Sequence, residues 1–306
     1  MVSRGDGRWS IGGVARALDH EGPIGVAYDE PSADLPEIPI YDLFEAVAGR
    51  HPDAIALAGV GAQSTFKQVR RELRALASRI ATEVPAGKAV AILLPNVPAS
   101  VVAVLACLAA GRICLVLNAD HPAERNREIL DRAEVHLVVI LDNSAAASLP
   151  CGLPHIAMLD LQQIDPDEES RPQTSMKSGD PAIVLYTSGS TGRPKGIVLS
   201  QRTILVRVRN NIVSLHLNTS DRFLSLGALG TTAGVVASIA ALLSGATQHV
   251  VSVTDIGMSS LLALIERERM TIVWACRPCC AHCLRLTEQV PRSRACARSV
   301  RSVSRC

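Results

Sequence analysis

The chain has 306 residues, 48% of them hydrophobic and 20% charged, and a formal net charge of +2. This length and apolar content are enough for one large buried core or two smaller ones, so we expect a soluble globular protein. A net charge so close to zero produces no field that would attract nucleic acid or an acidic membrane surface, and neither is expected as a partner.

The two longest apolar runs, 99–111 and 233–243, are too short to cross a bilayer, which requires roughly 20 apolar residues. Both runs are therefore expected to be buried helices. The amino terminus is polar and rich in glycine, without the continuous apolar core of a signal peptide. We therefore expect a cytoplasmic protein.

Residues 1–39 lack sustained periodicity and carry many Gly, Pro, Asp and Glu residues, which predicts an irregular leader. From residue 40 to about 275, apolar strands alternate with helices. The expected helices are 41–49, one capped at Ser64 or Thr65 that runs to about Glu83, one after Pro98, one opened by Pro122, and 201–213, 233–243 and 258–269. The expected strands are 54–60, 89–94, 113–117, 136–141, 182–186, 197–199, 223–226, 248–253 and 271–274.

Short sequence patterns predict a helix cap and a linking segment. Ser64 or Thr65 is expected to cap the helix that runs to about Glu83, with Gln68 returning a hydrogen bond. The turn-rich, acidic stretch 142–180 is expected to link two halves of the fold. Continuous apolar strands that alternate with helices imply mainly parallel sheets flanked by helices, which is an α/β fold.

The segment from Tyr186 to Gly196 follows one apolar strand, precedes another, and reads YTSGSTGRPKG. Its glycines allow backbone N–H groups to point into one concavity, which suits an anion. Hydroxyl groups between the glycines are donors for phosphate oxygens, and a lysine adds positive charge. The predicted phosphate-binding residues are Thr187, Ser188, Gly189, Ser190, Thr191, Gly192 and Lys195.

An alternative interpretation is a Ser/Gly-rich surface turn. The fixed offsets of the glycines, the hydroxyls between them and the proline beside the lysine favour phosphate binding instead. A Walker A loop is excluded, because that pattern ends in Gly-Lys-Ser/Thr whereas this one ends Pro194-Lys195-Gly196.

At these residues the chain resembles the adenylate-forming superfamily of acyl-CoA synthetases, luciferases and the adenylation domains of nonribosomal peptide synthetases. The stretches 105–125, which ends His-Pro-Ala-Glu-Arg, and 240–246, Ala-Ala-Leu-Leu-Ser-Gly-Ala, also resemble that family. The first is most similar to the peptide-synthetase members. The similarity covers residues 40–274 and implies part of the large amino-terminal domain of an adenylate-forming enzyme.

The resemblance implies a reaction in two steps. A carboxylic acid attacks the α-phosphate of ATP to give an acyl-adenylate, and the thiol of CoA or of a carrier-protein phosphopantetheine then accepts the acyl group. ATP and Mg²⁺ are the implied cofactors, with the β- and γ-phosphates held by the loop. Family members are longer, and the segments that carry their adenine, ribose and catalytic-lysine contacts have no counterpart here, so no catalytic residue is assigned. A non-catalytic remnant that binds nucleotide weakly, or acts only through a partner, is the alternative.

In amino-acid-activating members, an aspartate pairs with the substrate ammonium at the position that aligns with Thr232, and Thr231 replaces its usual aromatic neighbour. A neutral hydroxyl leaves a buried ammonium unpaired. The presence of Thr231 and Thr232 at these positions therefore predicts that the substrate pocket accepts an aryl, hydroxy or fatty acid. The alternative is that both residues only cap the following helix.

The carboxyl-terminal segment 276–306 changes composition abruptly, with seven Arg, six Cys and one acidic residue. A zinc site formed by Cys276, Cys279, Cys280, His282 and Cys283 is one interpretation, although its two cysteine pairs lie unusually close together. The other is an aberrant tail produced by a shifted reading frame. No metal ligand is assigned.

Overall fold

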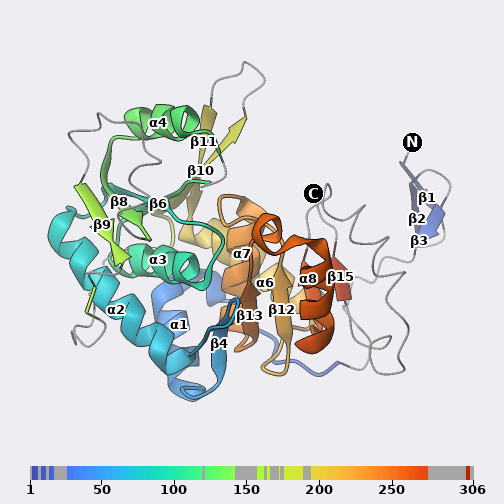
Figure 1. Ribbon diagram of the computed structural model, residues 1–306. Coiled ribbons are helices and arrows are strands. Elements are labelled where there is room, and N and C mark those ends of the chain that lie inside the picture. The colour runs from blue at the N-terminus through green and yellow to red at the C-terminus, as the bar shows by residue number, and fades with distance from the viewer. Residues whose placement is uncertain are drawn as a thin grey trace.

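The computed structural model describes residues 26–118, 121–141, 157–161, 164–165, 176–188 and 194–274, with residue 172 and the short segments 2–5, 8–11, 14–16 and 301–303. Within these residues the strands form two six-stranded sheets and one three-stranded sheet. Figure 1 shows the first large sheet at the upper left and the second at the lower right, with helices between them.

The first large sheet has the strand order β11-β10-β7-β6-β8-β9. All its neighbouring strands are parallel except β10 and β11, which form an antiparallel hairpin. Its strands are β6 (Ala89–Leu93), β7 (Ile113–Val116), β8 (Val135–Ile140), β9 (Ala157–Asp160), β10 (Pro181–Ser188) and β11 (Pro194–Ser200).

The second large sheet has the order β15-β14-β12-β13-β4-β5 and is parallel except for the β4–β5 pair. Strand β15, which pairs with β14 at one edge, lies in the segment for which we expected no strand. The strands are β4 (Ile55–Ala58), β5 (Gln63–Thr65), β12 (Arg222–Ser225), β13 (Thr247–Val250), β14 (Ile272–Trp274) and β15 (Arg301–Val303).

The expected leader, residues 1–39, contains regular elements that periodicity did not indicate. Three short antiparallel strands form the small sheet, β1 (Val2–Gly5), β2 (Arg8–Ile11) and β3 (Val14–Arg16). A 3-10 helix, η1 (Leu35–Glu37), follows, and its Leu35 is buried in the main core.

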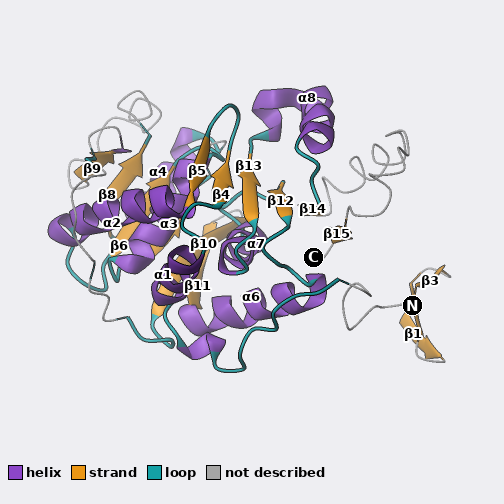
Figure 2. Cartoon of the chain, turned by 90° about the horizontal axis from the view of Figure 1, so that it is seen from below, coloured by secondary structure: helices purple, strands orange, loops and turns teal. Residues whose placement is uncertain are grey.

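The helices and sheets form five layers, as the alternation of buried side chains shows. The inner faces of both large sheets share one core cluster with α1, α2, α3, α6 and α7, whereas α4 covers the outer face of the first sheet and α8 that of the second. Figure 2 shows α8 on one side of β12 and β13, with α7 and α6 on the other. The helices are α1 (Ile40–Arg50), α2 (Phe66–Glu83), α3 (Pro98–Ala109), α4 (Ala123–Arg132), α6 (Gln201–Leu215), α7 (Thr232–Leu243) and α8 (Val253–Arg267).

Two local predictions are confirmed. Thr65 caps α2: its Oγ1 accepts a hydrogen bond from the Gln68 N–H at 3.2 Å, while Gln68 Oε1 accepts one from the Thr65 N–H at 2.8 Å. The two apolar runs form α3 and α7, which are buried on nearly every side. None of the helices in the described part of the chain combines the length and apolar character needed to span a membrane.

The expectation that residues 142–180 link two halves of the fold is wrong. Strands β8 and β10, on either side of this stretch, belong to the same sheet, and β9 within it extends that sheet by pairing with β8. The chain instead passes between the two sheets through α2 and α6.

The two large sheets meet at the carboxyl ends of their strands. The Asn96 side-chain amide, after β6, donates to the Val251 carbonyl, after β13, at 2.8 Å. Gly59, after β4, packs so tightly on Pro98 that a Cβ atom there would lie 2.9 Å from Pro98 Cγ. Open α/β sheets bind ligands at this carboxyl edge, so a ligand site is expected there.

Candidate nucleotide-binding site

The β10–β11 hairpin presents the predicted phosphate loop at the carboxyl end of a central strand. Its register pairs Tyr186 with Gly196, Thr187 with Lys195 and Ser188 with Pro194. Because β10 is parallel to β7, Ser188 at the end of β10 and Pro194 at the start of β11 lie at the same edge of the sheet as the loops that follow β6 and β7. Lys195 is exposed there.

Tyr186 and Gly196 fix the base of the hairpin. A Cβ atom at position 196 would lie 3.2 Å from Cζ of the Tyr186 ring and 3.4 Å from Val184 Cγ1. The ring also packs against the cluster between α4 and the sheet. Gly196 is therefore needed so that Tyr186 can lie across the neighbouring strand, which explains one glycine of the motif.

The structure describes only part of the predicted phosphate-binding set. Thr187 and Ser188 are the last residues of β10, and Lys195 lies opposite Thr187 on β11. Gly189, Ser190, Thr191 and Gly192 lie outside the described residues, as do Cys276, Cys279, Cys280, His282 and Cys283 of the proposed zinc interpretation.

The loop after β7 lies at the same edge and is held by hydrogen bonds to one carbonyl. Asn118 O accepts from the Asn126 side-chain amide at 3.0 Å and from the His121 N–H at 3.1 Å. Asn126 lies on α4 and is buried. These bonds fix the turn that leads into α4.

Gly230, the residue before the N-cap of α7, packs against this loop. A Cβ atom at Gly230 would lie 3.7 Å from Asn118 Cβ. Thr231 is the N-cap: its Oγ1 accepts from the Gly234 N–H at 3.1 Å and donates to Ala228 O at 2.8 Å. Capping by Thr231 is therefore observed, and Thr232, the first residue of α7, is half-buried beside it.

A further set of polar residues at this junction could not be selected from the sequence alone. A cavity of about 30 Å³ lies between the ends of β6 and β7 and the loop before α7, and its polar lining comes from Asn96, Ser100 and Asn118. The signal that could have found them is their position immediately after predicted strands, combined with the carboxyl-edge rule for ligand sites.

An α/β fold with two mainly parallel sheets, together with a hairpin at a carboxyl edge whose sequence is rich in glycine and hydroxyl groups, is typical of α/β proteins that bind phosphate-containing ligands. The model of the AMP-binding enzyme family matches residues 44–304. The chain therefore belongs to the AMP-binding, adenylate-forming family, and its fold is that of the amino-terminal subdomain of a nonribosomal peptide synthetase adenylation domain.

The chain is similar to parts of larger proteins. Surfactin synthase subunit 2 of Bacillus subtilis is 28% identical over 258 residues, which cover 82% of this chain and 7% of that protein. The nonribosomal peptide synthetase FmoA3, bound to α-methyl-L-serine-AMP, has a TM-score of 0.77 at 25% identity and covers 88% of this chain and 30% of its own. The NpsA amino-terminal subdomain of Klebsiella oxytoca has a TM-score of 0.72 at 24% identity, covering 84% and 65%. The chain thus spans less than a third of the length of surfactin synthase subunit 2 and of FmoA3.

Proposed function

We propose that this chain forms the ATP-phosphate-binding part of a ligase that activates a carboxylic acid as an acyl-adenylate. The observation that carries the proposal is the β10–β11 register, in which Lys195 lies opposite Thr187 where the hairpin leaves the carboxyl edge of the sheet. Oriented donors and a fixed positive charge stabilise the charge that develops on departing pyrophosphate. The AMPPNP-bound form of FmoA3 supports a nucleotide ligand.

The residues present are compatible with Mg²⁺ by their donor chemistry. Magnesium prefers oxygen ligands, keeps several waters and binds through substrate phosphates with few protein groups. The loop sequence offers hydroxyls, and the described residues contain no cluster of three or more His, Cys, Asp or Glu side chains that would hold a metal without the nucleotide. When bound, the ion would neutralise phosphate charge, while Thr187, Ser188 and Lys195 orient the phosphate chain.

The acid substrate and the thiol acceptor form the finer part of the proposal. Thr232 offers a neutral hydroxyl, and the lining of the small cavity is uncharged, so an aryl, hydroxy or fatty acid suits the site better than an α-amino acid. An artificially fused adenylation–carrier di-domain of NpsA with ThdA supports a carrier-protein thiol as acceptor. CoA is the other candidate acceptor.

The test is nucleotide binding by the full chain, measured by calorimetry with AMPPNP and Mg²⁺. Lys195→Ala is expected to weaken binding about tenfold to a hundredfold, because it removes a charge-assisted contact of roughly 1.5–3 kcal/mol. Lys88→Ala is the matched control, since Lys88 is also exposed but precedes β6 at the opposite edge of the same sheet. Equal affinities for the unaltered chain and the Lys195 variant would reject the assignment.

The non-catalytic remnant is the second candidate. It predicts weak nucleotide binding at the same loop and no acid-dependent exchange of pyrophosphate into ATP, whereas a complete ligase shows such exchange.

A further inference from the structure

A second cavity lies away from the phosphate loop, at the amino edge of the second large sheet. It is an open groove of about 1030 Å³. Four of its lining residues, His51, Asp221, Gly245 and Thr271, lie a few residues or fewer before β4, β12, β13 and β14 respectively. The nucleotide proposal therefore leaves this groove unexplained.

The carboxyl-terminal ends of three helices line the groove. Arg50 ends α1, Ile212 lies in the last turn of α6, and Leu243 ends α7. Helix carboxyl ends carry partial negative charge. Neither α6 nor α7 has a basic residue in its last turn, and Arg50 turns back so that its Nε donates to Ala46 O of its own helix at 3.4 Å.

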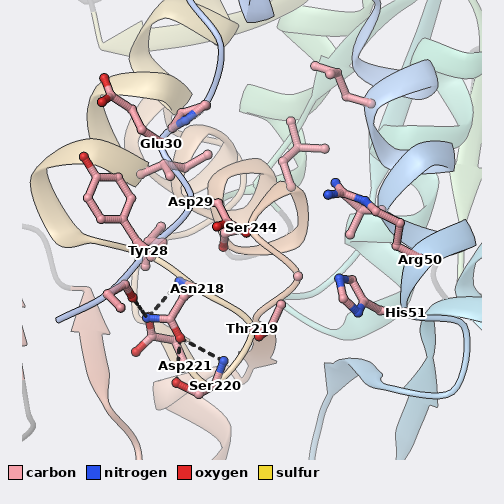
Figure 3. Close-up of a pocket in the computed structure, with 18 of the residues that line it drawn as sticks. Tyr28, Asp29, Glu30, Arg50, His51, Asn218, Thr219, Ser220, Asp221 and Ser244 are labelled. Atoms are coloured by element: carbon pink, nitrogen blue, oxygen red, sulfur yellow. Dashed lines mark hydrogen bonds between the residues drawn. The ribbon is translucent and has the colours of Figure 1, made fainter.

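Acidic side chains add to this negative charge. Asp29, Glu30 and Asp221 line the groove together with the single guanidinium of Arg50. Glu30 pairs with Arg209 at 3.1 Å. Asp29 is exposed and makes no hydrogen bond or ion pair with any other described residue. Figure 3 shows Tyr28, Asp29 and Glu30 on one side of the groove and Arg50 and His51 on the other.

The wall that carries Asp29 is held in place by the end of α6. The Asn218 amide donates to Ala27 O at 3.2 Å, and Tyr28 stacks on His216 with 4.2 Å between ring centroids. Below it, the buried Asp221 carboxylate accepts from the Thr271 hydroxyl at 2.7 Å and from the Asn218 N–H at 3.1 Å. The groove is therefore preformed, which reduces the entropy cost of binding.

We propose that this groove binds a basic polypeptide segment, which presents Arg or Lys side chains to Asp29 and to the carboxyl ends of α6 and α7. Charge complementarity favours a basic occupant, because an anionic ligand would face the exposed carboxylate of Asp29 and the carboxyl ends of α6 and α7, which have no basic residue in their last turns. The floor contains Leu35, Val47 and Leu217, which suits the apolar stems of Arg and Lys side chains. At about 1030 Å³ the groove exceeds most small-molecule pockets and fits a peptide segment.

The experiment measures the fluorescence anisotropy of a labelled peptide of alternating arginine and alanine, titrated with the full chain at physiological ionic strength. A peptide of alternating glutamate and alanine serves as the negative ligand. Asp29→Lys is expected to weaken binding about fivefold or more, since it replaces attraction with repulsion. Asp131→Lys is the control. It changes the net charge by the same amount at an exposed position of α4 that does not line the groove, and it is expected to change affinity less than about twofold.

A steric variant separates the groove from general surface charge. Ala46 is an exposed residue of α1 that lines the groove, so Ala46→Trp places a large side chain there without altering charge. We expect this variant to lose peptide binding, while its circular dichroism spectrum remains unchanged. The proposal is overturned if the unaltered chain does not bind the arginine peptide, if both lysine variants weaken binding equally, or if Ala46→Trp binds normally. Binding of AMPPNP should not be affected by any of these variants, so this test is independent of the nucleotide proposal.

Discussion

At the first turn of α7, Gly234 leaves no room for a side chain. A Cβ atom there would lie 2.2 Å from Ala228 O, well inside van der Waals contact. Ala228 is also where the Thr231 hydroxyl donates its hydrogen bond. The glycine therefore lets the helix begin directly against the loop that lines the candidate site.

Gly234→Ala is expected to destabilise the protein by about 3 kcal/mol, because the loop or the helix must move. Gly49→Ala is the matched control, since a Cβ atom there meets nothing within 4 Å and the residue lies in α1. That change should be neutral or stabilising by up to about 1 kcal/mol. Chemical denaturation of both variants measures the difference, and equal stabilities would contradict the packing seen at α7.

His249 on β13 makes stability depend on pH. Burial lowers the pKa of His249 from 6.5 to about 4, and the nearby Arg222 guanidinium acts in the same direction. The unfolded chain therefore binds more protons than the folded one between these two values. Stability is fully present above about pH 6.5 and is lost as the pH falls towards 4, by about 3 kcal/mol at most.

Denaturant unfolding at a series of pH values tests this effect against His249→Leu, which cannot titrate. The variant should lose less stability than the unaltered chain between pH 6.5 and 4. Parallel pH profiles would show that His249 is not the cause.

At the scale of elements, Arg112 ties the ends of two helices together. Its Nε donates to Val84 O at 2.8 Å and its Nη2 to Ala81 O at 2.9 Å, both at the end of α2, while Nη1 donates to Ala110 O at the end of α3. A cation at helix carboxyl ends is favourable, and a planar guanidinium reaches both helices at once.

Arg112→Ala should reduce the free energy of unfolding by about 2–3 kcal/mol, because buried carbonyl groups lose a charged donor. Arg112→Lys should recover only part of this, since a single ammonium group cannot bridge both helices. Arg127→Ala, which breaks an exposed pair with Asp131 at 3.8 Å, should cost less than about 0.5 kcal/mol. Thermal melts of the three variants provide the comparison, and similar melting temperatures would reject the bridging role.

The elements that could be predicted from the sequence were those encoded locally. Thr65 and Gln68 mark the start of α2 because the cap and its partner lie within one turn. Strands β5 and β9 were missed because they are short, and their pairing with β4 and β8 rather than their own residues creates them. The assignment of β8 and β10 to one sheet depends on strand order, which periodicity does not encode.

The candidate site likewise has one part that is encoded locally and another that depends on the tertiary fold. The loop motif was visible because its residue types and spacing carry the chemistry. Asn96, Ser100 and Asn118 were not, because ordinary polar residues become notable only when two sheets bring them to one junction. The groove at the amino edge escaped prediction for the same reason, since segments 26–31, 43–51 and 217–221 meet only in the fold.

At the scale of the whole molecule, we predict that this chain alone does not complete acyl-adenylate synthesis at a useful rate. Proximity and orientation supply about 7–11 kcal/mol of barrier lowering, and a phosphate loop by itself fixes only one end of ATP. Lys195 is exposed, and contact with water weakens the electrostatic contribution of the loop.

ATP–pyrophosphate exchange with a panel of amino, aryl, hydroxy and fatty acids tests this prediction on the purified, folded chain. We expect exchange no faster than in the Lys195→Ala variant. Robust acid-dependent exchange that this substitution abolishes would show that the chain is a complete catalyst.

The order of strands in the second large sheet also constrains synthesis on the ribosome. The described strands of the first sheet come from one continuous stretch, β6 to β11, whereas the second sheet joins β4 to β13, with Leu57 opposite Gln248. At about 5–20 residues per second, β4 waits on the order of ten seconds or more for this partner to emerge. During that interval the edge of β4 that pairs with β13 lacks its partner strand. We therefore expect the nascent chain to be most exposed to chaperones after the first sheet has formed and before β13 appears.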